Sequence, residues 1–552
     1  MNPECYPITM LPQTSRLFLD FLERPDALAP FYVRGAYAES WAGEAVDFDR
    51  SKRAQLADLL TEQNRSFGAG EAAMANIERL RTGASAVVSG QQVVLFGGPL
   101  LTLLKAATAI RKAQDASAAG YPHVPIFWLA SEDHDLDEAG HLELPTRHEV
   151  RTLRWDGGHT GAARPVGNLQ LGESIVPLLD EAGALLGPGP WLEDLERAYT
   201  PEATFGSAFG RWIASVFAEH GLIVIDASTR AFHALGAETL RRAITDADRL
   251  AGRLLDRDRE LAAAGYHSQV LVAPGSSLLF LLDEETGARL PLRRERSQGV
   301  SSREPDAGAT DAQGGEWKAG KKSYSTRELL AILDAAPERL SPNALLRPVF
   351  QDTILPTASY VGGPAEIAYF AQSQVLYEAI LGRTTPVSPR LSATLVEAPV
   401  AAAMARFGVT LPDFFRLSPD ELAQRVGARS IPVEGKQMMA RAGNALDEEL
   451  TALTGWMQAL DADLGRSAAV SASKMRYQMN RLRRLAANFQ LQRDASLRRH
   501  VDALYLALYP DRHPQERVLG GAWFLARYGP GLPLLLVEHA SQQCPGHKLI
   551  YL

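Results

Sequence analysis

The sequence has few cysteines and no excess of positive charge, and both shortages exclude classes of protein. Its 552 residues include two cysteines, Cys5 and Cys544, which exclude a disulfide scaffold, a four-cysteine zinc site and an iron–sulfur cluster built by this chain alone. Lys and Arg number 57 against 65 Asp and Glu, a formal net charge of −8, which disfavours a polyanion such as DNA as the main partner. These counts predict a protein of the reducing cytoplasm without a nucleic-acid partner.

Long hydrophobic runs are also missing. Uninterrupted apolar stretches such as residues 503–509 are far shorter than the ~20 residues that cross a bilayer. The first residues lack the basic start and apolar stretch of a signal peptide, so we expect a soluble cytoplasmic protein with no membrane partner. The hydrophobic share of 46% is ordinary for a globular chain, and the length is about three to four times that of a ~150-residue domain.

The first half of the chain alternates short apolar runs with helical stretches. Strands are predicted at residues 85–90, 124–131 and 221–227, with a helix at 100–116 between the first two. Strands that are apolar on both faces and alternate with helices are typical of a parallel α/β sheet. Because such sheets bind ligands at the carboxyl ends of their strands, the polar residues that follow these strands form the candidate site.

Two later regions depart from this pattern. Residues 266–292 predict an insertion of short antiparallel strands, Gln298–Lys322 predicts a mobile loop, and a strand-like pattern resumes at 345–360. Beyond Pro399 the chain is helical, and apolar residues spaced three and four apart predict two long helices. Those residues are Leu446, Leu450, Leu453, Met457, Leu460 and Leu464, then Met475, Met479, Leu482, Ala486 and Phe489. Gly465 and Ser467 between the runs leave an antiparallel pair and one rod both open, and the helices can form a dimer interface or a bundle within one chain.

The first candidate motif follows the strand at 85–90. Its Gly-Gly-Pro turn opens a helix and would present backbone N–H groups to an anion, unless it only starts a buried helix. Two adjacent glutamines favour ligand binding. The candidate ligand-binding residues here are Ser89, Gln91, Gln92, Gly97, Gly98, Thr102 and Lys105.

The second motif is an acidic cluster directly after the strand at 124–131. It runs Glu132, Asp133, His134, Asp135, Leu136, Asp137, Glu138, Ala139, Gly140, His141. If a helix starts near His134, then His134, Glu138 and His141 share one face, where they could act as general acid and base or hold a metal. An acidic helix start would explain the carboxylates but not the two histidines.

The third motif repeats the first. A second Gly-Gly-Pro turn, Gly362–Pro364, opens a second helix, so two anion-binding turns can face one cleft. The alternative is that both turns only begin a helix and bind no ligand. The candidate ligand-binding residues are Gln351, Asp352, Tyr360, Gly362, Gly363 and Glu366.

Four stretches together resemble the bacillithiol-biosynthesis cysteine-adding enzymes, the BshC family. They are VVSGQQVVLFGGPLLTLLKAATAI, VPIFWLASEDHDLDEAGH, RPVFQDTILPTASYVGGPAEIAYFAQ and LYPDRHPQERVLGGAWFLARYGP. They are spread over nearly the whole chain, and their order is also similar. The resemblance implies an α/β fold with a Rossmann-like parallel sheet core, connecting-peptide insertions and an α-helical coiled-coil domain that makes a homodimer.

The expected domain boundaries follow from the resemblance and the pattern together. They are 1–155 for the first part of the core, 156–220 for an insertion, 221–265 for a core strand and helix, 266–340 for an insertion with a mobile loop, 341–400 for the second part of the core, 401–510 for the coiled coil and 511–552 for a segment returning to the core.

The resemblance also implies a reaction. The family's proposed reaction joins the carboxyl of L-cysteine to the amine of glucosaminyl-malate and gives bacillithiol. An amide formed from a free carboxylate requires activation, for which ATP with Mg²⁺ is the expected source. On this hypothesis the first motif binds the malate carboxylates or phosphate, Glu132, His134, Asp135 and His141 act on the amine, and the third motif binds cysteine or the sugar.

Two alternatives remain at this stage. The acidic cluster would also suit a metal-dependent hydrolase or amidase, although no resident metal is expected, and the chain could instead be a non-catalytic coiled-coil dimer that binds a nucleotide or thiol. Cys5 and Cys544 lie outside every motif. We therefore predict that neither is a nucleophile.

Overall fold

A central parallel sheet organises the body of the protein. The structure is a computed structural model that describes residues 4–44, 46–146, 148–157, 163–273, 275–295, 316–493, 495–541 and 544–552. Five strands pair in the order β13-β12-β2-β3-β6, each neighbour parallel to the next. They are β2 (Ser85–Gln92), β3 (His123–Ala130), β6 (Ile223–Asp226), β12 (Thr357–Gly362) and β13 (Val387–Pro389). The predicted parallel α/β core is confirmed.

Helices cover both faces of this sheet. Val124, Ile126 and Trp128 of β3 belong to one apolar core, and Phe127 and Leu129 belong to the other, because successive side chains of a strand point to opposite faces. The first core includes α2 (Arg50–Ser66), α3 (Glu71–Arg81), α9 (Arg230–Thr245), α10 (Ala247–Ala263), α12 (Arg347–Ile354) and α13 (Pro364–Leu381); the second includes α4 (Leu101–Ala118), α8 (Phe205–Val216), α21 (Gly521–Tyr528) and α22 (Gly531–His539).

The strand-like pattern predicted at 345–360 is wrong in its first part. Residues Arg347–Ile354 form α12, and only Thr357–Gly362 form a strand. Pro348 lies in the first turn of α12, where its fixed φ favours a helix. A short apolar run with buried residues on several sides does not distinguish helix from strand by periodicity.

Two insertions interrupt the core. The first contains α5 (Leu136–Ala139), the hairpin of β4 (His141–Pro145) and β5 (Val150–Arg154), α6 (Val176–Leu186) and α7 (Pro190–Ala198). The second is an antiparallel sheet of order β10-β9-β8-β7-β11 with α11 packed beside it. Its elements are β7 (Ser276–Leu282), β8 (Arg289–Glu295), β9 (Glu316–Ala319), β10 (Lys322–Ser325), α11 (Thr326–Ala335) and β11 (Leu340–Pro342).

The second insertion confirms the antiparallel strands and corrects the mobile loop predicted at Gln298–Lys322. Residues 298–315 of that loop lie outside the described residues. Residues 316–319 instead form β9, where Trp317 is buried and its Nε1–H donates to Thr326 Oγ1 at 3.0 Å. A single large aromatic residue anchors this hairpin within an otherwise polar stretch.

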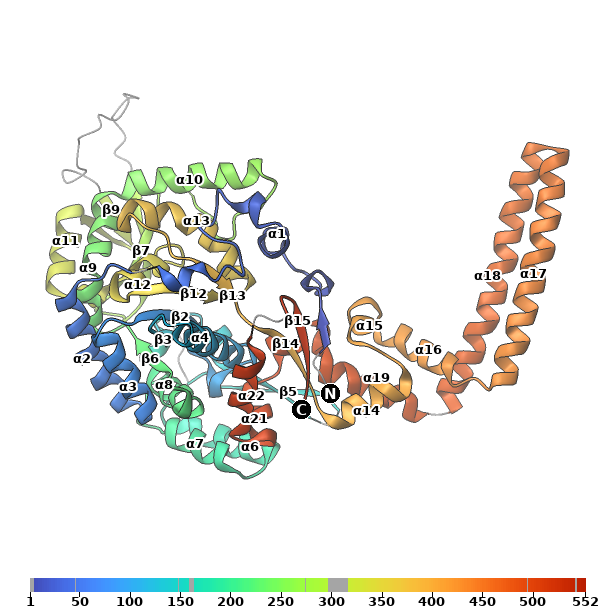
Figure 1. Cartoon of the computed structure of the whole chain (residues 1–552), viewed down its shortest axis with the longest axis horizontal. Coiled ribbons are helices and arrows are strands. Elements are labelled where there is room, and N and C mark those ends of the chain that lie inside the picture. The colour runs from blue at the N-terminus through green and yellow to red at the C-terminus, as the bar shows by residue number, and fades with distance from the viewer. Residues whose placement is uncertain are drawn as a thin grey trace.

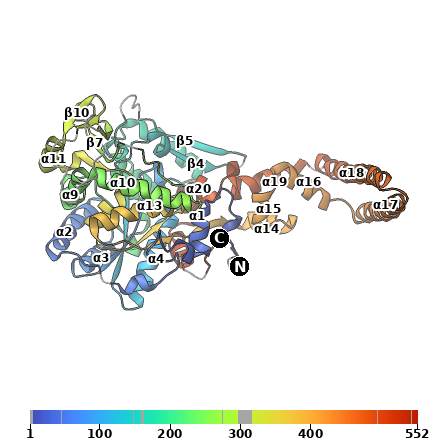
Figure 2. The same cartoon turned by 90° about the horizontal axis from the view of Figure 1, so that it is seen from above.

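The C-terminal region is helical and projects from the body, as both views show (Figures 1 and 2). It contains α14 (Ala398–Phe407), α15 (Leu411–Arg416), α16 (Pro419–Arg429), α17 (Val433–Leu460), α18 (Ala462–Arg493) and α19 (Ala495–Leu508). The long helices α17 and α18 form an antiparallel hairpin, tied by an ion pair between Arg476 and Asp447 at 2.7 Å. The chain turns at Asp461, which has an extended backbone, rather than at Gly465 and Ser467.

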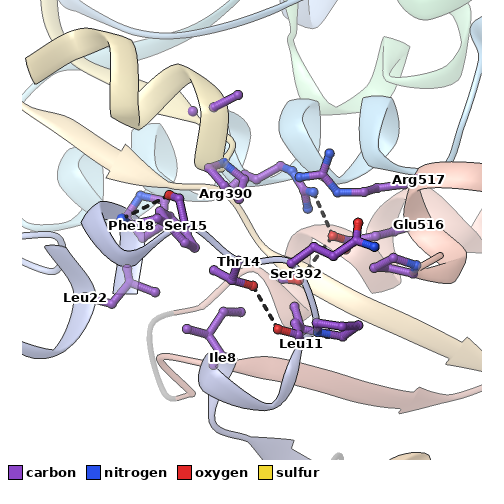
Figure 3. A pocket seen from close by; sticks show the side chains of 18 of the residues that line it. Ile8, Leu11, Thr14, Ser15, Phe18, Leu22, Arg390, Ser392, Glu516 and Arg517 are labelled. Atoms are coloured by element: carbon purple, nitrogen blue, oxygen red, sulfur yellow. Dashed lines mark hydrogen bonds and ion pairs between the residues drawn. The ribbon is translucent and has the colours of Figure 1, made fainter. Parts of the chain in front are cut away.

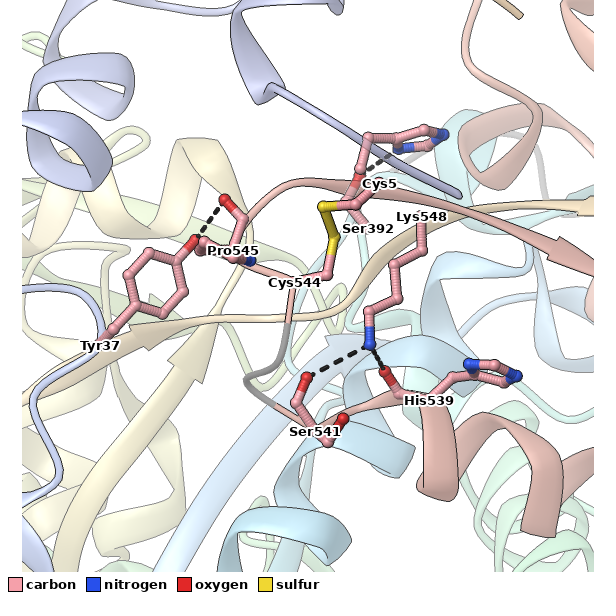
Figure 4. The surroundings of a disulfide bond; sticks show 9 residues. Cys5, Tyr37, Ser392, His539, Ser541, Cys544, Pro545 and Lys548 are labelled. Atoms are coloured by element: carbon pink, nitrogen blue, oxygen red, sulfur yellow. Dashed lines mark hydrogen bonds between the residues drawn. A yellow bond between two sulfur atoms is a disulfide. The ribbon is translucent and has the colours of Figure 1, made fainter. Parts of the chain in front are cut away.

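The two ends of the chain meet on a small sheet. Strand β15 (His547–Tyr551) pairs with β14 (Ser392–Val396) and with β1 (Glu4–Tyr6). Beside them lie α1 (Arg16–Glu23) and α20 (Gln515–Val518). Cys5 and Cys544 form a disulfide at this junction (Figure 4), a single bond that the exclusion of a disulfide scaffold leaves possible but that a protein of the reducing cytoplasm is not expected to contain. Within the described ranges, no helix is long and apolar enough to cross a membrane.

Candidate active site

The sheet has a point where its connections reverse direction. From β2 the chain passes through α4 to β3, whereas from β12 it passes through α13 to β13 on the other side. Because β2 and β12 are neighbours and α4 and α13 lie on opposite faces, the reversal lies at the carboxyl ends of these two strands, in a region that we call the crevice. Open α/β sheets bind their ligands at such a reversal.

Lys105 and Glu366 form an ion pair that joins the two helices across the crevice. Lys105 Nζ lies 2.6 Å from Glu366 Oε2 and donates to Gly90 O at 2.7 Å and Gln91 Oε1 at 2.9 Å. Glu366 also accepts from the Gly363 N–H at 2.8 Å and from the Tyr360 hydroxyl at 2.6 Å. The sequence-predicted residues of the first and third motifs therefore meet here.

Burial and the neighbouring charge shift the pKa values of Glu366 and Lys105 in opposite directions. Burial by itself raises the pKa of Glu366, but Lys105, the Gly363 N–H and Tyr360 outweigh it and hold that pKa below its usual value. Burial lowers the pKa of Lys105, and Glu366 partly offsets this. A buried charge is tolerated when it is paired and hydrogen-bonded, as both of these are.

Arg347 lies next to this pair and has neutral partners. Its guanidinium donates to the Tyr369 hydroxyl at 2.7 Å, to Gln351 Oε1 at 3.2 Å and to the Tyr360 hydroxyl at 3.4 Å. In the part of the chain that the structure describes, no carboxylate bonds directly to Arg347. Glu366 acts on Arg347 through space, and the guanidinium could still pair with an anionic ligand in the crevice.

The acidic cluster begins with a carboxylate that a buried histidine holds. Glu132 Oε1 lies 2.9 Å from His233 Nε2, and His233 Nδ1 lies 3.1 Å from Pro337 O. A carbonyl only accepts, so His233 Nδ1 donates to it, and a proton must also lie between Nε2 and Glu132. Glu132 Oε2 has no hydrogen-bond partner among the described residues. It is therefore available to a reacting group.

The rest of the cluster is spread along the edge of the crevice. The Gln92 side chain donates to Asp133 Oδ2 and, at 3.3 Å, to Glu138 Oε2. His134 Nδ1 lies 3.7 Å from Asp133 Oδ1 and 3.5 Å from the Arg289 guanidinium. Asp133 and His134 are both 36% exposed, so their side chains remain accessible.

The helical face predicted for the cluster does not exist. Helix α5 is limited to Leu136–Ala139, and His141 already begins β4, so His134 and His141 do not share a stripe. Gly140 ends the helix, and a Cβ there would lie 2.5 Å from Trp155 O. Asp135 caps α5 by accepting the Glu138 N–H at 3.0 Å, while His141 Nδ1 lies 2.9 Å from Asp137 O.

The first Gly-Gly-Pro turn is packed inside the protein. The prediction that both Gly-Gly-Pro turns face one cleft is therefore wrong for the first turn. Gly97 has φ +85°, and a Cβ there would lie 2.0 Å from the Trp212 ring. Gly98 O accepts the Gly521 N–H at 2.9 Å. Thr102 is fully buried, with its hydroxyl unpaired among the described residues.

Three other predicted residues have internal partners. The Ser89 hydroxyl donates to Val361 O at 2.8 Å and so joins β2 to β12. Asp352 accepts from Gln351, Tyr377 and Thr385 inside the core. Of these, Gln351 alone contacts the crevice, through Arg347.

Two residues at the site were missed by sequence reasoning. His233 comes from α9, and Arg289 comes from β8 of the second insertion, where it lies 3.9 Å from the Phe280 ring centre and donates to Pro342 O at 2.9 Å. Burial lowers the pKa of Arg289, while Glu132 and Asp133 partly offset this. Neither residue lies near a motif along the chain, so only the tertiary fold shows them.

A metal site has little support in this arrangement. Throughout the described ranges, no three His, Cys, Asp or Glu side chains come together in a way that could hold a metal ion. The metal-dependent hydrolase alternative therefore lacks a ligand set here.

Comparisons with known proteins identify the family. Residues 1–391 match the family model described as "Bacillithiol biosynthesis BshC, N-terminal Rossmann-like domain", and residues 393–552 match the "C-terminal coiled-coil domain" of the same family. A solved structure described as a putative arginyl tRNA synthetase from Campylobacter jejuni covers 87% of this chain and 98% of its own at 12% identity, with a TM-score of 0.21 that is too low to show a shared fold.

Curated relatives carry the same family name over their full length. The proteins named "Putative cysteine ligase BshC" from Koribacter versatilis and Solibacter usitatus are 40% and 36% identical, and each match covers 100% of both chains. The protein of that name from Thermus thermophilus is 32% identical, over 90% of this chain and 94% of its own. The chain belongs to the BshC family, with a Rossmann-like core and a coiled-coil domain.

Proposed function

We propose that the protein is an ATP-dependent ligase that forms an amide between the carboxyl of L-cysteine and the amine of glucosaminyl-malate, the last step of bacillithiol biosynthesis. The observation that carries the proposal is a crevice with cations on one side and carboxylates on the other, at the reversal point of the sheet. The relatives' name, cysteine ligase, supports the same reaction class.

The cationic side fits a substrate or nucleotide anion. Arg347 has only neutral hydrogen-bond partners among the described residues, and a guanidinium of that kind suits a carboxylate or phosphate. ATP, when bound, would supply the activation that a free carboxylate needs before an amine can displace its oxygen. Mg²⁺ would be held by the phosphates with one or two carboxylates, for which Asp133 and Glu138 are the accessible candidates.

The acidic side fits the amine. An amine that attacks a carboxyl carbon must lose a proton, and Glu132 Oε2 is the unpartnered carboxylate oxygen at the end of β3. His233 holds the other oxygen of Glu132 and so fixes the direction of the carboxylate. Arg289 places positive charge near Glu132 and Asp133, where it stabilises the ionised form of these clustered carboxylates.

The coiled coil fits a homodimer. Residues of the predicted apolar seam remain exposed on the hairpin, including Leu453 at 48%, Leu482 at 58% and Phe489 at 60%, and Trp456 is 59% exposed. Exposed apolar residues in such number on a two-helix hairpin indicate a surface that another copy covers. Sedimentation of the full chain, compared with a variant carrying Trp456→Glu and Phe489→Glu, tests this.

The activity is tested with purified protein, L-cysteine, glucosaminyl-malate and Mg-ATP. Mass spectrometry should detect bacillithiol in the complete mixture and none when any one component is omitted. The variant Lys105→Met should abolish product, and Arg65→Gln, a change at the exposed end of α2, should not. A complete mixture that consumes no cysteine under any of these conditions would contradict the proposal.

A further inference from the structure

A separate cavity lies where the two ends of the chain meet. It has a volume of about 420 Å³ and is bounded by N-terminal residues between Ile8 and Leu22, by the end of β13 and by C-terminal residues between His513 and Gly546 (Figure 3). We call it the terminal pocket. Its lining includes neither Lys105 nor Glu132, but it includes Gly362 and the first turn of α13, so the terminal pocket adjoins the crevice described above.

One wall of the terminal pocket carries two arginines and one carboxylate. Arg390 is buried and donates to Glu516 Oε1 at 2.7 Å and to Leu391 O at 2.7 Å. Arg517 approaches Arg390 in Figure 3 but makes no hydrogen bond or ion pair with any residue that the structure describes. Glu516 is already paired with Arg390, so Glu516 and Glu366 act on Arg517 only through space.

The surroundings of Arg517 do not favour its charge. Although Arg517 as a whole is exposed, desolvation of its guanidinium and the nearby Arg390 lower its pKa, and Glu516 and Glu366 partly offset this. The first turn of α13, with Pro364 and Ala365, also lines the cavity and adds the positive end of an 18-residue helix. Arg390, Arg517 and the start of α13 thus lie around one space together with the carboxylates of Glu516 and Glu366. Of these groups, the Arg517 guanidinium has no hydrogen-bonded partner among the described residues, so an anion there would pair with it.

The opposite wall combines apolar side chains with the polar residues Gln13, Thr14 and Ser15. Ile8, Leu11 and Phe18 line it, and Ile8 and Phe18 are largely buried. A cavity with a partly apolar wall and a few convergent charged groups is the usual form of a small-molecule site. This combination favours an organic anion over a bare inorganic ion.

The backbone around the terminal pocket is strained. Among the described residues, four other than glycine have positive φ: Gln13, Phe96, Asp511 and Arg512. Gln13 lines the pocket, and Asp511 and Arg512 directly precede His513, which also lines it. Such conformations cluster at ligand-binding sites, where the surrounding structure holds them.

We propose that the terminal pocket binds a small organic anion, carrying two carboxylates or a phosphate, with its charged end beside Arg517 and the first turn of α13 and its carbon skeleton against Ile8 and Phe18. The proposal goes beyond the reaction above: the terminal pocket shares the turn at Gly362 and the start of α13 with the crevice, but that reaction assigns no role to Arg517, Ile8 or Phe18. The ligand is a substrate portion that extends from the crevice or a separate effector, and the same chemistry serves both.

Binding is measured on the full chain by calorimetry, in a buffer free of phosphate and carboxylates. L-malate and a phosphomonoester such as glycerol phosphate are the probes, and the uncharged diamide of malate is the control ligand. At least one anion should bind and the diamide should not. The variant Arg517→Gln should weaken binding about tenfold or more, as expected for the loss of a charged hydrogen-bond donor.

Arg65→Gln is the matched control, since it removes one arginine from an exposed position of α2. Binding that is equally weakened in both variants, unchanged in Arg517→Gln, or absent for both anions overturns the proposal. With turnover measured in parallel, a raised KM for the dicarboxylate substrate in Arg517→Gln identifies a substrate portion, and unchanged kinetics identify an effector. The binding result stands even if no turnover is found.

Discussion

The two sides of the crevice carry opposite charges and differ in how these charges are satisfied. On the β12 side, Lys105 and Glu366 are 6% and 17% exposed and bond to each other and to neighbouring protein groups. On the β3 side, Glu132 is 21% exposed with one free oxygen, and Asp133 is 36% exposed. The Lys105–Glu366 pair is therefore a fixed scaffold that joins α4 to α13 beside Arg347, and the acidic side is the one with a carboxylate oxygen left to take a proton from a reacting group.

The largest expected effect comes from breaking the scaffold. Glu366→Gln removes the charge partner of Lys105, which is 5% exposed, and leaves a buried ammonium with neutral partners. We expect the free energy of unfolding in urea to fall by about 3–5 kcal/mol and turnover to be lost with it. The double variant Lys105→Met with Glu366→Leu should recover most of that stability without recovering turnover. A single variant as stable as the parent would show that the pair is not a scaffold.

The next largest effect, a loss of turnover, should come from a change on the acidic side. This change should leave the free energy of unfolding unaltered. Glu132→Gln keeps an oxygen that accepts from His233 but removes the proton acceptor, so kcat should fall about 10²–10⁴-fold. Asp137→Asn is the control, because Asp137 belongs to the same cluster and its side chain is fully exposed to solvent. Equal losses in the two variants would mean that the cluster acts through its summed charge rather than through Glu132.

The contrast between the sides also predicts a pH dependence. Although burial raises the pKa of Glu366, Lys105 and the hydrogen bonds outweigh it and keep the pKa lowered in the folded state. A carboxylate of this kind contributes stability at neutral pH, and the contribution is lost as the pH falls through its folded pKa. The free energy of unfolding should therefore drop below about pH 4, and less steeply in the Lys105→Met, Glu366→Leu variant. Parallel curves for the two proteins would contradict this.

Sequence patterns predicted the scaffold better than the reactive side. Gln91 lies at the carboxyl end of β2, Lys105 lies on the helix that follows it, and Glu366 follows β12, so the rule that parallel strands present ligand sites at their carboxyl ends was enough to select them. His233 and Arg289 contact the acidic cluster from 101 and 155 residues away along the chain. No local pattern encodes contacts at such separations.

Two predictions made from local sequence patterns were wrong because of tertiary contacts. The helix expected from His134 stops at Ala139 because Gly140 packs against the Trp155 carbonyl, a contact with the next strand that periodicity does not contain. The first Gly-Gly-Pro turn has the residues of an anion site, but Trp212 of α8 packs directly on Gly97. In both places a tertiary neighbour decides what the local sequence leaves open.

The smallest effect on turnover should come from the disulfide, which lies on the terminal sheet away from both sides of the crevice. Cys5→Ser removes a crosslink between positions 539 residues apart, and without reductant the free energy of unfolding should fall by about 2–4 kcal/mol because the unfolded chain gains freedom. Under reducing conditions the variant and the parent should be equally stable. Neither sulfur bonds to a crevice residue, so kcat should match that of the parent in both buffers. Thiol alkylation followed by mass spectrometry reports the redox state in each assay, and a loss of turnover in Cys5→Ser under reducing conditions would assign that sulfur a chemical role.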